Sequence, residues 1–176
     1  MAENLKTTKY NNGTPIPQVT DTTSWNNLST PAYCWYNNDA AFRKSAYGAL
    51  YNWYTVNSGE LCPTGWHVPA DAEWTTLTDY LEGASVAGGK LKETGTMHWT
   101  DPNTGATNES GFTALPGGLR DRGSFNGLGN KGGWWSSEEY RSDYALGREM
   151  QSVENSVGFM YHERKQIGFS IRCVKD

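Results

Sequence analysis

Two stretches in the first half of the chain carry apolar residues at the three- and four-residue spacing of an amphipathic helix. The first stretch predicts a helix over about residues 39–56, opened by the short polar side chains of residues 37–39 and ended by the turn residues 57–59. Its apolar face holds Tyr47, Leu50, Tyr51 and Tyr54.

The second helix follows a compact segment, residues 62–74, in which a tight turn, a short extended run and a helix start succeed one another. Pro69 ends the extended run. The helix is expected over about residues 70–81, with Asp71 as the N-cap and Gly83 after the last turn. Its apolar face holds Trp74, Leu77 and Leu81.

From about residue 97 onward, short apolar segments separated by glycine replace the helical spacing and predict strands and loops. A long glycine-rich loop region is expected over about residues 83–133. The pattern as a whole predicts an α+β fold, with two helices early and a twisted antiparallel sheet after them. The strands of this sheet are expected at Trp134–Ser137, Tyr144–Arg148, Val157–Tyr161 and Ile167–Val174.

A period of two assigns faces within these strands. Trp134 and Trp135 fall on opposite faces, so we expect one of them in the core and the other at the surface. In the last strand, Gly168 indicates a close backbone neighbour. It lies opposite an apolar face made of Ile167, Phe169, Ile171 and Cys173.

Composition narrows the class of protein. The 176 residues fit one domain, 1–176, and an aromatic share of 13% suggests that large rings fill its core. The net charge of -4, without a clustered basic face, argues against nucleic-acid binding. No run approaches the roughly 18 apolar residues of a membrane helix, so we expect no membrane insertion of this domain.

The start of the sequence and its cysteines leave two questions open. The first residues suit either a cytoplasmic protein or a segment that follows a trimmed leader. The three cysteines allow one disulfide and one thiol, or three reduced thiols. No Cys-x-x-Cys or His-x-x-x-His spacing occurs, so we expect no metal or other cofactor.

Seven motifs follow one another along almost the whole chain. They occupy residues 2–6, Cys34–Asp39, Tyr47–Trp53, Cys62–Pro69, Ser110–Gly118, Trp134–Ser137 and Gly168–Val174. In this order they resemble the Fibrobacter succinogenes major paralogous domain. The resemblance implies the C-type lectin-like fold, which that family shares with the formylglycine-generating enzyme and the variable proteins of diversity-generating retroelements. It also implies a cell-surface or secreted protein of Bacteroidetes, in which the domain follows a lipoprotein leader.

The resemblance further implies a disulfide between Cys62 and Cys173. In C-type lectin-like domains a cysteine after the first helix bonds to a cysteine in the last strand. The bond would close a loop of more than a hundred residues and stabilise the fold by up to about 4 to 5 kcal/mol. Cys34 would then be the remaining thiol. The alternative is that all three cysteines are buried and reduced.

Catalytic activity is not expected. The formylglycine-generating enzyme needs a close pair of cysteines in its C-terminal region, where this chain has only Cys173. The three histidines have no sequence neighbour that would form a nucleophile dyad, and we interpret His67 as a hydrogen-bonded structural residue. Glu138 and Glu139 would point to opposite faces of a strand, which is poor geometry for glycoside hydrolysis.

Ligand recognition is the function that we expect, because lectin-like domains present loops over a rigid sheet. The candidate segments are residues 95–133 and 138–166, whose polar side chains suit sugar hydroxyls, while Phe125 or Trp135 would stack on a pyranose face. The alternatives are a protein-binding surface, as in an adhesin or receptor-recognition module, and a purely structural module. The candidate residues are Arg120, Asp121, Arg122, Phe125, Asn126, Asn130 and Trp135.

Calcium-dependent sugar binding is not expected, because the Glu-Pro-Asn, Gln-Pro-Asp and Trp-Asn-Asp motifs of calcium-binding lectins are absent. An oxygen-rich cluster around Pro102 and Gly105 fits either a structural calcium ion or a set of turns. We favour the turns. The cluster comprises Asp101, Asn103, Asn108 and Glu109.

Overall fold

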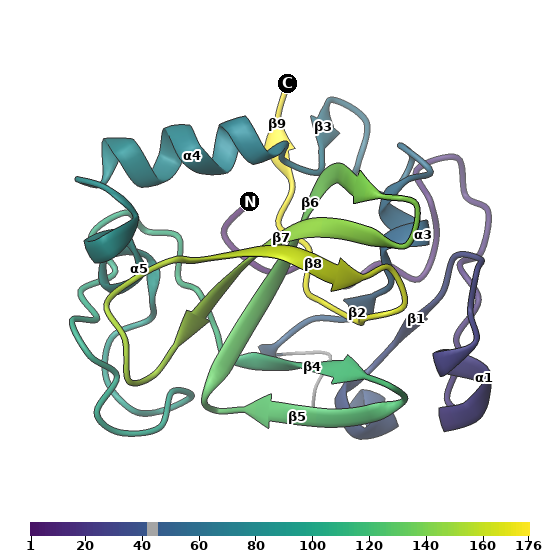
Figure 1. Ribbon diagram of the computed structural model, residues 1–176, viewed down its shortest axis with the longest axis horizontal. Helices are drawn as coiled ribbons and strands as arrows, with labels where there is room; N and C mark the ends of the chain where they lie inside the picture. Colours follow the sequence, from purple (N-terminus) through teal and green to yellow (C-terminus); the bar gives the residue numbers. More distant parts are fainter. Residues whose placement is uncertain (42–45) are drawn as a thin grey trace.

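The computed structural model describes residues 1–41 and 46–176. A five-stranded sheet with the strand order β5-β4-β6-β7-β8 forms its centre (Figure 1). Neighbouring strands run antiparallel except β4 and β6, which run parallel. The predicted α+β class is confirmed, although the sheet is mixed. Its strands are β4 (Gly117–Asp121), β5 (Ser124–Leu128), β6 (Lys131–Arg141), β7 (Tyr144–Gln151) and β8 (Gly158–Arg164).

Helices α4 (Asp71–Tyr80) and α5 (Ala84–Leu91) pack against one face of this sheet. Trp74 of α4 and Leu91 of α5 meet Trp134 and Met150 of the sheet in one buried cluster. The shorter helices are α1 (Thr22–Asn26), the 3-10 helix η1 (Tyr36–Asn38) and α3 (Trp53–Val56).

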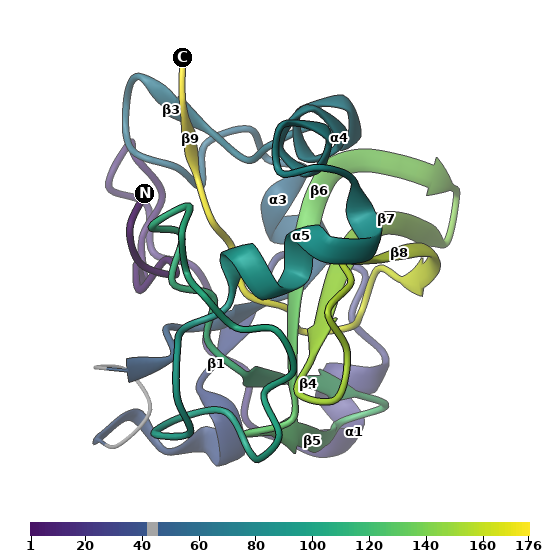
Figure 2. The ribbon, with the colours of Figure 1, turned by 90° about the vertical axis from the view of Figure 1, so that its left-hand side faces the viewer.

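Two small antiparallel sheets join distant parts of the chain. β1 (Tyr33–Cys34) pairs with β2 (Leu50–Tyr51). β3 (Trp66–His67) pairs with β9 (Val174–Lys175), so the last strand lies beside the segment that precedes α4 (Figure 2).

The disulfide between Cys62 and Cys173 lies next to this second small sheet and is confirmed, with an S–S distance of 2.00 Å. It joins residues 111 positions apart in the sequence. Cys34 is the remaining thiol and is buried, as expected.

The core is built largely from tryptophan and tyrosine rings. Trp134 and Trp135 are both fully buried, so the expectation that one of them reaches the surface is wrong. β6 is a central strand, and both of its faces are covered. Trp134 packs below α4 and α5, whereas Trp135 packs on Phe169 at 4.6 Å between ring centroids and donates a hydrogen bond to the backbone oxygen of Tyr51.

The face assignment of the last predicted strand is confirmed, although its strand extent is not. Its four apolar residues all lie in the main core cluster. A Cβ on Gly168 would lie 3.3 Å from the Cβ atoms of Arg120 and Leu50, which explains the glycine. Residues 168–170 form isolated bridges to Arg120, Tyr51 and Trp134 and not a continuous ladder. Regular strand is confined to β9, Val174–Lys175.

The predicted single helix over residues 39–56 is wrong in its continuity, and residues 42–45 of it lie outside the described residues. Residues 40, 41 and 46 and α3 are helical, but residues 47–52 are not. Gly48 adopts a φ of +81°, and a Cβ there would lie 2.8 Å from the backbone oxygen of Leu5. The chain then extends into β2, and Asn52 caps α3 by accepting a hydrogen bond from the Thr55 backbone N–H. Long-range packing therefore overrides the helical spacing of the tyrosines.

The second predicted helix is confirmed as α4, but its N-cap is Ala70 and not Asp71. The Glu73 carboxylate accepts the Ala70 backbone N–H at 2.9 Å, which supplies half of a capping box. Asp71 instead pairs with Arg148 of β7. The expected loop region 83–133 is also more ordered than predicted, because it contains α5, β4 and β5.

Candidate ligand-binding surface

The predicted site residues of the β4–β5 hairpin divide between its two faces. Cross-strand register places Arg120 opposite Phe125, and Leu119 opposite Asn126. Since opposed residues share a face and neighbours alternate, Asp121 lies on the face of Asn126, away from Arg120. The hairpin therefore cannot present all of these side chains to one ligand.

Arg120 faces the interior and is fully buried. Its guanidinium donates to the backbone oxygens of Val19 and Thr20 at 2.7 Å and to that of Gly123 at 3.2 Å. The same group lies 4.5 Å from the Trp25 ring centroid. Arg120 thus binds the N-terminal segment to the hairpin, and the expectation that it meets a sugar is wrong.

The two rings proposed for sugar stacking, Phe125 and Trp135, both pack against other side chains of the protein. Trp135 has no exposed surface. Phe125 is half-buried between Arg120, at 4.8 Å, and the ring of Tyr36, at 5.3 Å between centroids. Trp135 offers no free face, so its stacking role is wrong, whereas the stacking role of Phe125 stays a prediction.

The remaining predicted residues lie at the surface. Asp121 accepts a hydrogen bond from Arg164 of β8 at 3.0 Å, an ion pair that joins β4 to β8. Arg122 is exposed in the hairpin turn, and Asn126 is exposed on β5. Asn130 is exposed in the turn before β6 and accepts a hydrogen bond from the Thr100 hydroxyl.

The oxygen-rich cluster at residues 101–109 forms turns, as favoured. The Asn103 amide donates to the backbone oxygens of Glu93 and Gly95, and the Asn108 side chain accepts from the Thr113 backbone N–H at 2.8 Å. Glu109 pairs with Lys90 at 3.1 Å, and Asp101 is exposed. Among the described residues, no group of three His, Cys, Asp or Glu side chains could hold a metal ion.

A buried lysine stands beside these turns. The Lys92 ammonium donates to the backbone oxygens of Thr104, Gln151 and Glu154 at 3.0, 3.0 and 2.7 Å. Burial lowers the pKa of Lys92 to about 8. One side chain therefore joins the turn region to the loop between β7 and β8.

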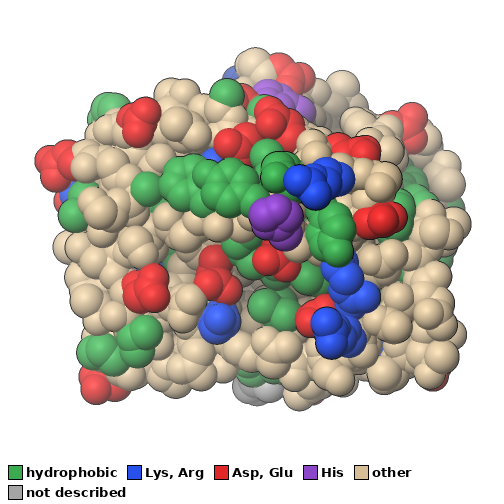
Figure 3. Space-filling model, in the orientation of Figure 1, with side chains coloured by type: hydrophobic (Ala, Val, Ile, Leu, Met, Phe, Trp, Pro, Cys, Tyr) green, Lys and Arg blue, Asp and Glu red, His purple; other side chains and the backbone are tan. Residues whose placement is uncertain are grey.

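An exposed group of rings lies on β6 and β8, the two strands that flank β7. We call it the aromatic band and define it as Tyr140, Phe159, Tyr161 and His162. The exposed fractions of Tyr161, Phe159 and Tyr140 are 48%, 39% and 37%. Figure 3 shows hydrophobic side chains and a histidine running across the middle of one face of the molecule, with basic side chains at one end.

Contacts between rings order the band. Phe159 and Tyr161, two residues apart on β8, stack with ring planes 7° apart and centroids 5.9 Å apart. His162 meets Tyr140 edge-to-face at 4.8 Å. The guanidinium of Arg148 lies 4.3 Å from the Phe159 centroid, and that of Arg141 lies 5.0 Å from the Tyr140 centroid.

Irregularities in the strands explain why these rings reach the surface. Gly147 of β7 pairs with Met160 and Ala145 pairs with Glu163, so two residues of β8 oppose the single residue between Gly147 and Ala145. On the other side of β7, the register of β6 shifts twice between Trp135 and Arg141. Such bulges turn side chains out of the regular alternation. They place both Tyr161 and His162 at the surface.

The electrostatics beside the band are mixed. Lys131 pairs with Glu149 at 3.4 Å, and Asp121 pairs with Arg164. Burial, and then the nearby charges of Glu149 and Asp121, raise the pKa of the Glu163 carboxyl. The surface thus combines aromatic rings with several hydrogen-bonding groups.

Sequence reasoning included residues 138–166 as a candidate segment but singled out none of the band. The available signal was the run Phe159-Met160-Tyr161-His162, where large rings occur in a strand that ends in charged residues. Which of those rings are exposed depends on the bulges, which the alternation of residue types does not reveal.

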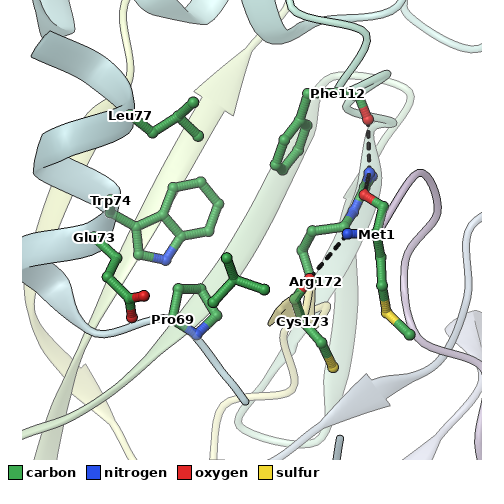
Figure 4. Close-up of a pocket in the computed structure, with 9 residues that line it drawn as sticks. Met1, Pro69, Glu73, Trp74, Leu77, Phe112, Arg172 and Cys173 are labelled. Atoms are coloured by element: carbon green, nitrogen blue, oxygen red, sulfur yellow. Dashed lines mark hydrogen bonds between the residues drawn. The ribbon is translucent and has the colours of Figure 1, made fainter. Parts of the chain in front are cut away.

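A separate cavity of about 210 Å³ lies between α4 and the last strand. Figure 4 shows Glu73, Trp74 and Leu77 of α4 along one wall, with Phe112 and Arg172 along the other. The Arg172 guanidinium donates to the Phe112 backbone oxygen at 2.6 Å, and burial lowers its pKa to about 10. Pro69, Cys173 and Val174 complete the lining together with Met1.

Together, the fold and surface define an α+β domain closed by a disulfide, with an exposed aromatic band on its main sheet. The model of the family described as the Fibrobacter succinogenes major domain matches residues 1–175, and the chain belongs to this family. No curated protein and no solved structure gives a significant match. Within the described residues, no helix has the length and apolar character needed to cross a membrane.

Proposed function

We propose that this protein is a non-catalytic recognition module that binds carbohydrate, and that the aromatic band is its binding surface. The observation that carries the proposal is the exposure of three rings, Tyr140 on β6 and Phe159 and Tyr161 on β8, two strands that lie on either side of β7 in one sheet. Aromatic rings offer an apolar face that matches the C–H face of a sugar ring. A contiguous patch of exposed apolar rings on a protein surface commonly marks an interaction site.

Polar groups near the band supply the second component of sugar recognition. Asp121 of β4 forms an ion pair with Arg164 of β8, two residues beyond His162 of the band, whereas Asn126 lies on β5 at the opposite edge of the sheet. The carboxylate and guanidinium groups of this pair match the donors and acceptors of sugar hydroxyls. The proposal therefore keeps Asp121 from the predicted residues and places the aromatic contact at the band instead of at Trp135.

The bulged edge strand favours a carbohydrate over a protein strand as the ligand. β8 ends the strand order of the main sheet, so its outer side is free of a named strand among the described elements. A flat edge would suit pairing with a strand of another protein. The bulge opposite β7 interrupts that edge and instead exposes rings.

The C-type lectin-like fold, the single-domain organisation and an extracellular location belong to the same proposal. The disulfide from Cys62 to Cys173 supports the fold, because it matches what the family resemblance implies. The family match over residues 1–175 supports one domain. A disulfide also suits an oxidising compartment outside the cytoplasm.

The test is a glycan array followed by calorimetry on each sugar that binds. Replacement of Tyr161 by alanine should lower the affinity by about tenfold or more, since central aromatic anchors contribute roughly 2 kcal/mol or more to binding. Tyr80→Ala is the matched control, because Tyr80 is 84% exposed on α4 and lies outside the band. The control should bind like the unaltered protein.

Two outcomes would contradict the proposal. A blank array, combined with capture of a surface protein by the band, would favour the protein-recognition alternative. Equal losses in Tyr161→Ala and Tyr80→Ala would mean that sugar binds elsewhere. Arg120→Ala and Trp135→Ala are unsuitable probes, because each removes a buried side chain and so tests folding.

A further inference from the structure

His67 stands between two carboxylates from different parts of the chain. Its Nδ1 lies 2.6 Å from Asp176, the residue after β9, and its Nε2 lies 3.0 Å from Glu73 of α4. An imidazole can donate from both nitrogens only when it is protonated. The pKa of His67 is accordingly raised, by the hydrogen bond to Asp176 and then by that to Glu73.

This bridge adds side-chain contacts to the backbone contacts that hold the C-terminal segment beside β3. His67 also pairs with Val174 in the β3–β9 ladder, and the Asp176 backbone N–H donates to the Gly65 oxygen at 3.1 Å. Glu73 keeps a second partner, the Ala70 backbone N–H, whatever the state of the histidine. Loss of either contact to the imidazole therefore removes the side-chain connection between Asp176 and α4, while the pairing of β3 with β9 remains.

The bridge lies beside the cavity under α4. Glu73 and Val174 belong to both the bridge region and the cavity wall. Figure 4 shows Glu73 on the α4 side of the cavity and Cys173, which also lines it, on the opposite side. A change in the contact between His67 and Glu73 therefore alters a wall of the cavity. The cavity has α4 on one side and the last strand on the other, the two elements that the imidazolium connects.

We propose that His67 is a proton-operated latch that holds the C-terminal segment, and with it one wall of the cavity, against α4. The charged groups that face the imidazole are Glu73 from α4 and Asp176 from the C-terminal segment, and both favour its protonated form. The sign follows from the raised pKa. The latch is closed below the ordinary histidine pKa of about 6.5 and opens as pH rises through the higher pKa of the folded protein.

Hydrogen exchange measured by NMR between about pH 5 and pH 9 tests the latch. The protection factor of the Asp176 amide should fall by a factor of about 2 to 5 as His67 loses its proton, the range expected for exposed charge contacts. In His67→Gln the protection should be low and independent of pH. The matched control is His162→Gln, which removes an exposed histidine of the aromatic band and should keep the pH dependence of the unaltered protein.

A direct NMR titration of the His67 ring gives a second measurement, which does not depend on the His67→Gln variant. Its pKa should fall in both Glu73→Gln and Asp176→Asn. A pKa for His67 at or below the ordinary value would overturn the proposal. The same pH dependence of Asp176 protection in His67→Gln as in the unaltered protein would overturn it as well.

Discussion

Reduction of the disulfide between Cys62 and Cys173 should remove a large share of the stability of this domain. The bond closes a segment with a sequence separation of 111, which restricts the unfolded chain. In the chain-entropy relation, a loop of that size corresponds to about 4.8 kcal/mol at 25 °C. Since a typical domain is stable by about 5 to 15 kcal/mol, the reduced protein should be close to its unfolding threshold.

The assay is urea unfolding of the oxidised and reduced protein, followed by fluorescence of the buried tryptophans. Reduction keeps both sulfur atoms, so it separates the cross-link from side-chain packing, whereas Cys62→Ala/Cys173→Ala removes both. We expect the midpoint to fall and the m-value to rise, because the reduced unfolded chain exposes more surface. Cys34→Ala under oxidising conditions is the control, because it removes the one free thiol of the described residues and leaves the disulfide intact. A loss of less than about 1 kcal/mol on reduction would refute the chain-entropy reasoning.

Three further predictions concern buried groups. Arg120→Met should cost about 3 to 5 kcal/mol in urea unfolding, because it leaves buried carbonyl oxygens without their charged donor; a loss below 1 kcal/mol would contradict this role. The Cys34 thiol, whose pKa burial raises to about 12, should resist iodoacetamide at pH 8 and react once in denaturant; labelling of the folded protein would be inconsistent with its burial. Gly88→Ala should cost about 1 to 3 kcal/mol, because the new Cβ would lie 2.2 Å from the Ser156 oxygen, and Ser85→Ala on the exposed side of α5 should be nearly neutral.

The parts of the fold that sequence predicted well are those fixed by local periodicity. α4 appears where Trp74, Leu77 and Leu81 repeat at helical spacing, and the burial of Phe169 follows from alternation in the last segment. The helix over residues 39–56 failed because Gly48 packs against Leu5, a contact between residues far apart in the sequence. Local spacing carries no information about such a neighbour.

Arg120 shows why the predicted binding residues were only partly useful. A charged side chain in a glycine-rich segment is usually exposed, so its type suggests a ligand contact. Here the partners are backbone oxygens of Val19 and Thr20, about a hundred positions earlier in the chain. Burial of the guanidinium is tolerable because several oxygens accept its protons and Trp25 covers its face.

The aromatic band shows a feature that sequence alone does not reveal, because the exposure of its rings depends on irregular strand pairing. Regular alternation would send Phe159 and Tyr161 to one face and His162 to the other. The bulge in β8 breaks this rule next to Leu146, and the shifts in β6 bring Tyr140 to the same region. Because bulges in both strands flank β7, the surface depends on the whole sheet and not on any one segment. Inserting one residue beside Leu146, so that two residues of β7 face Tyr161 and His162, should therefore abolish sugar binding on the glycan array even though every ring of the band is retained.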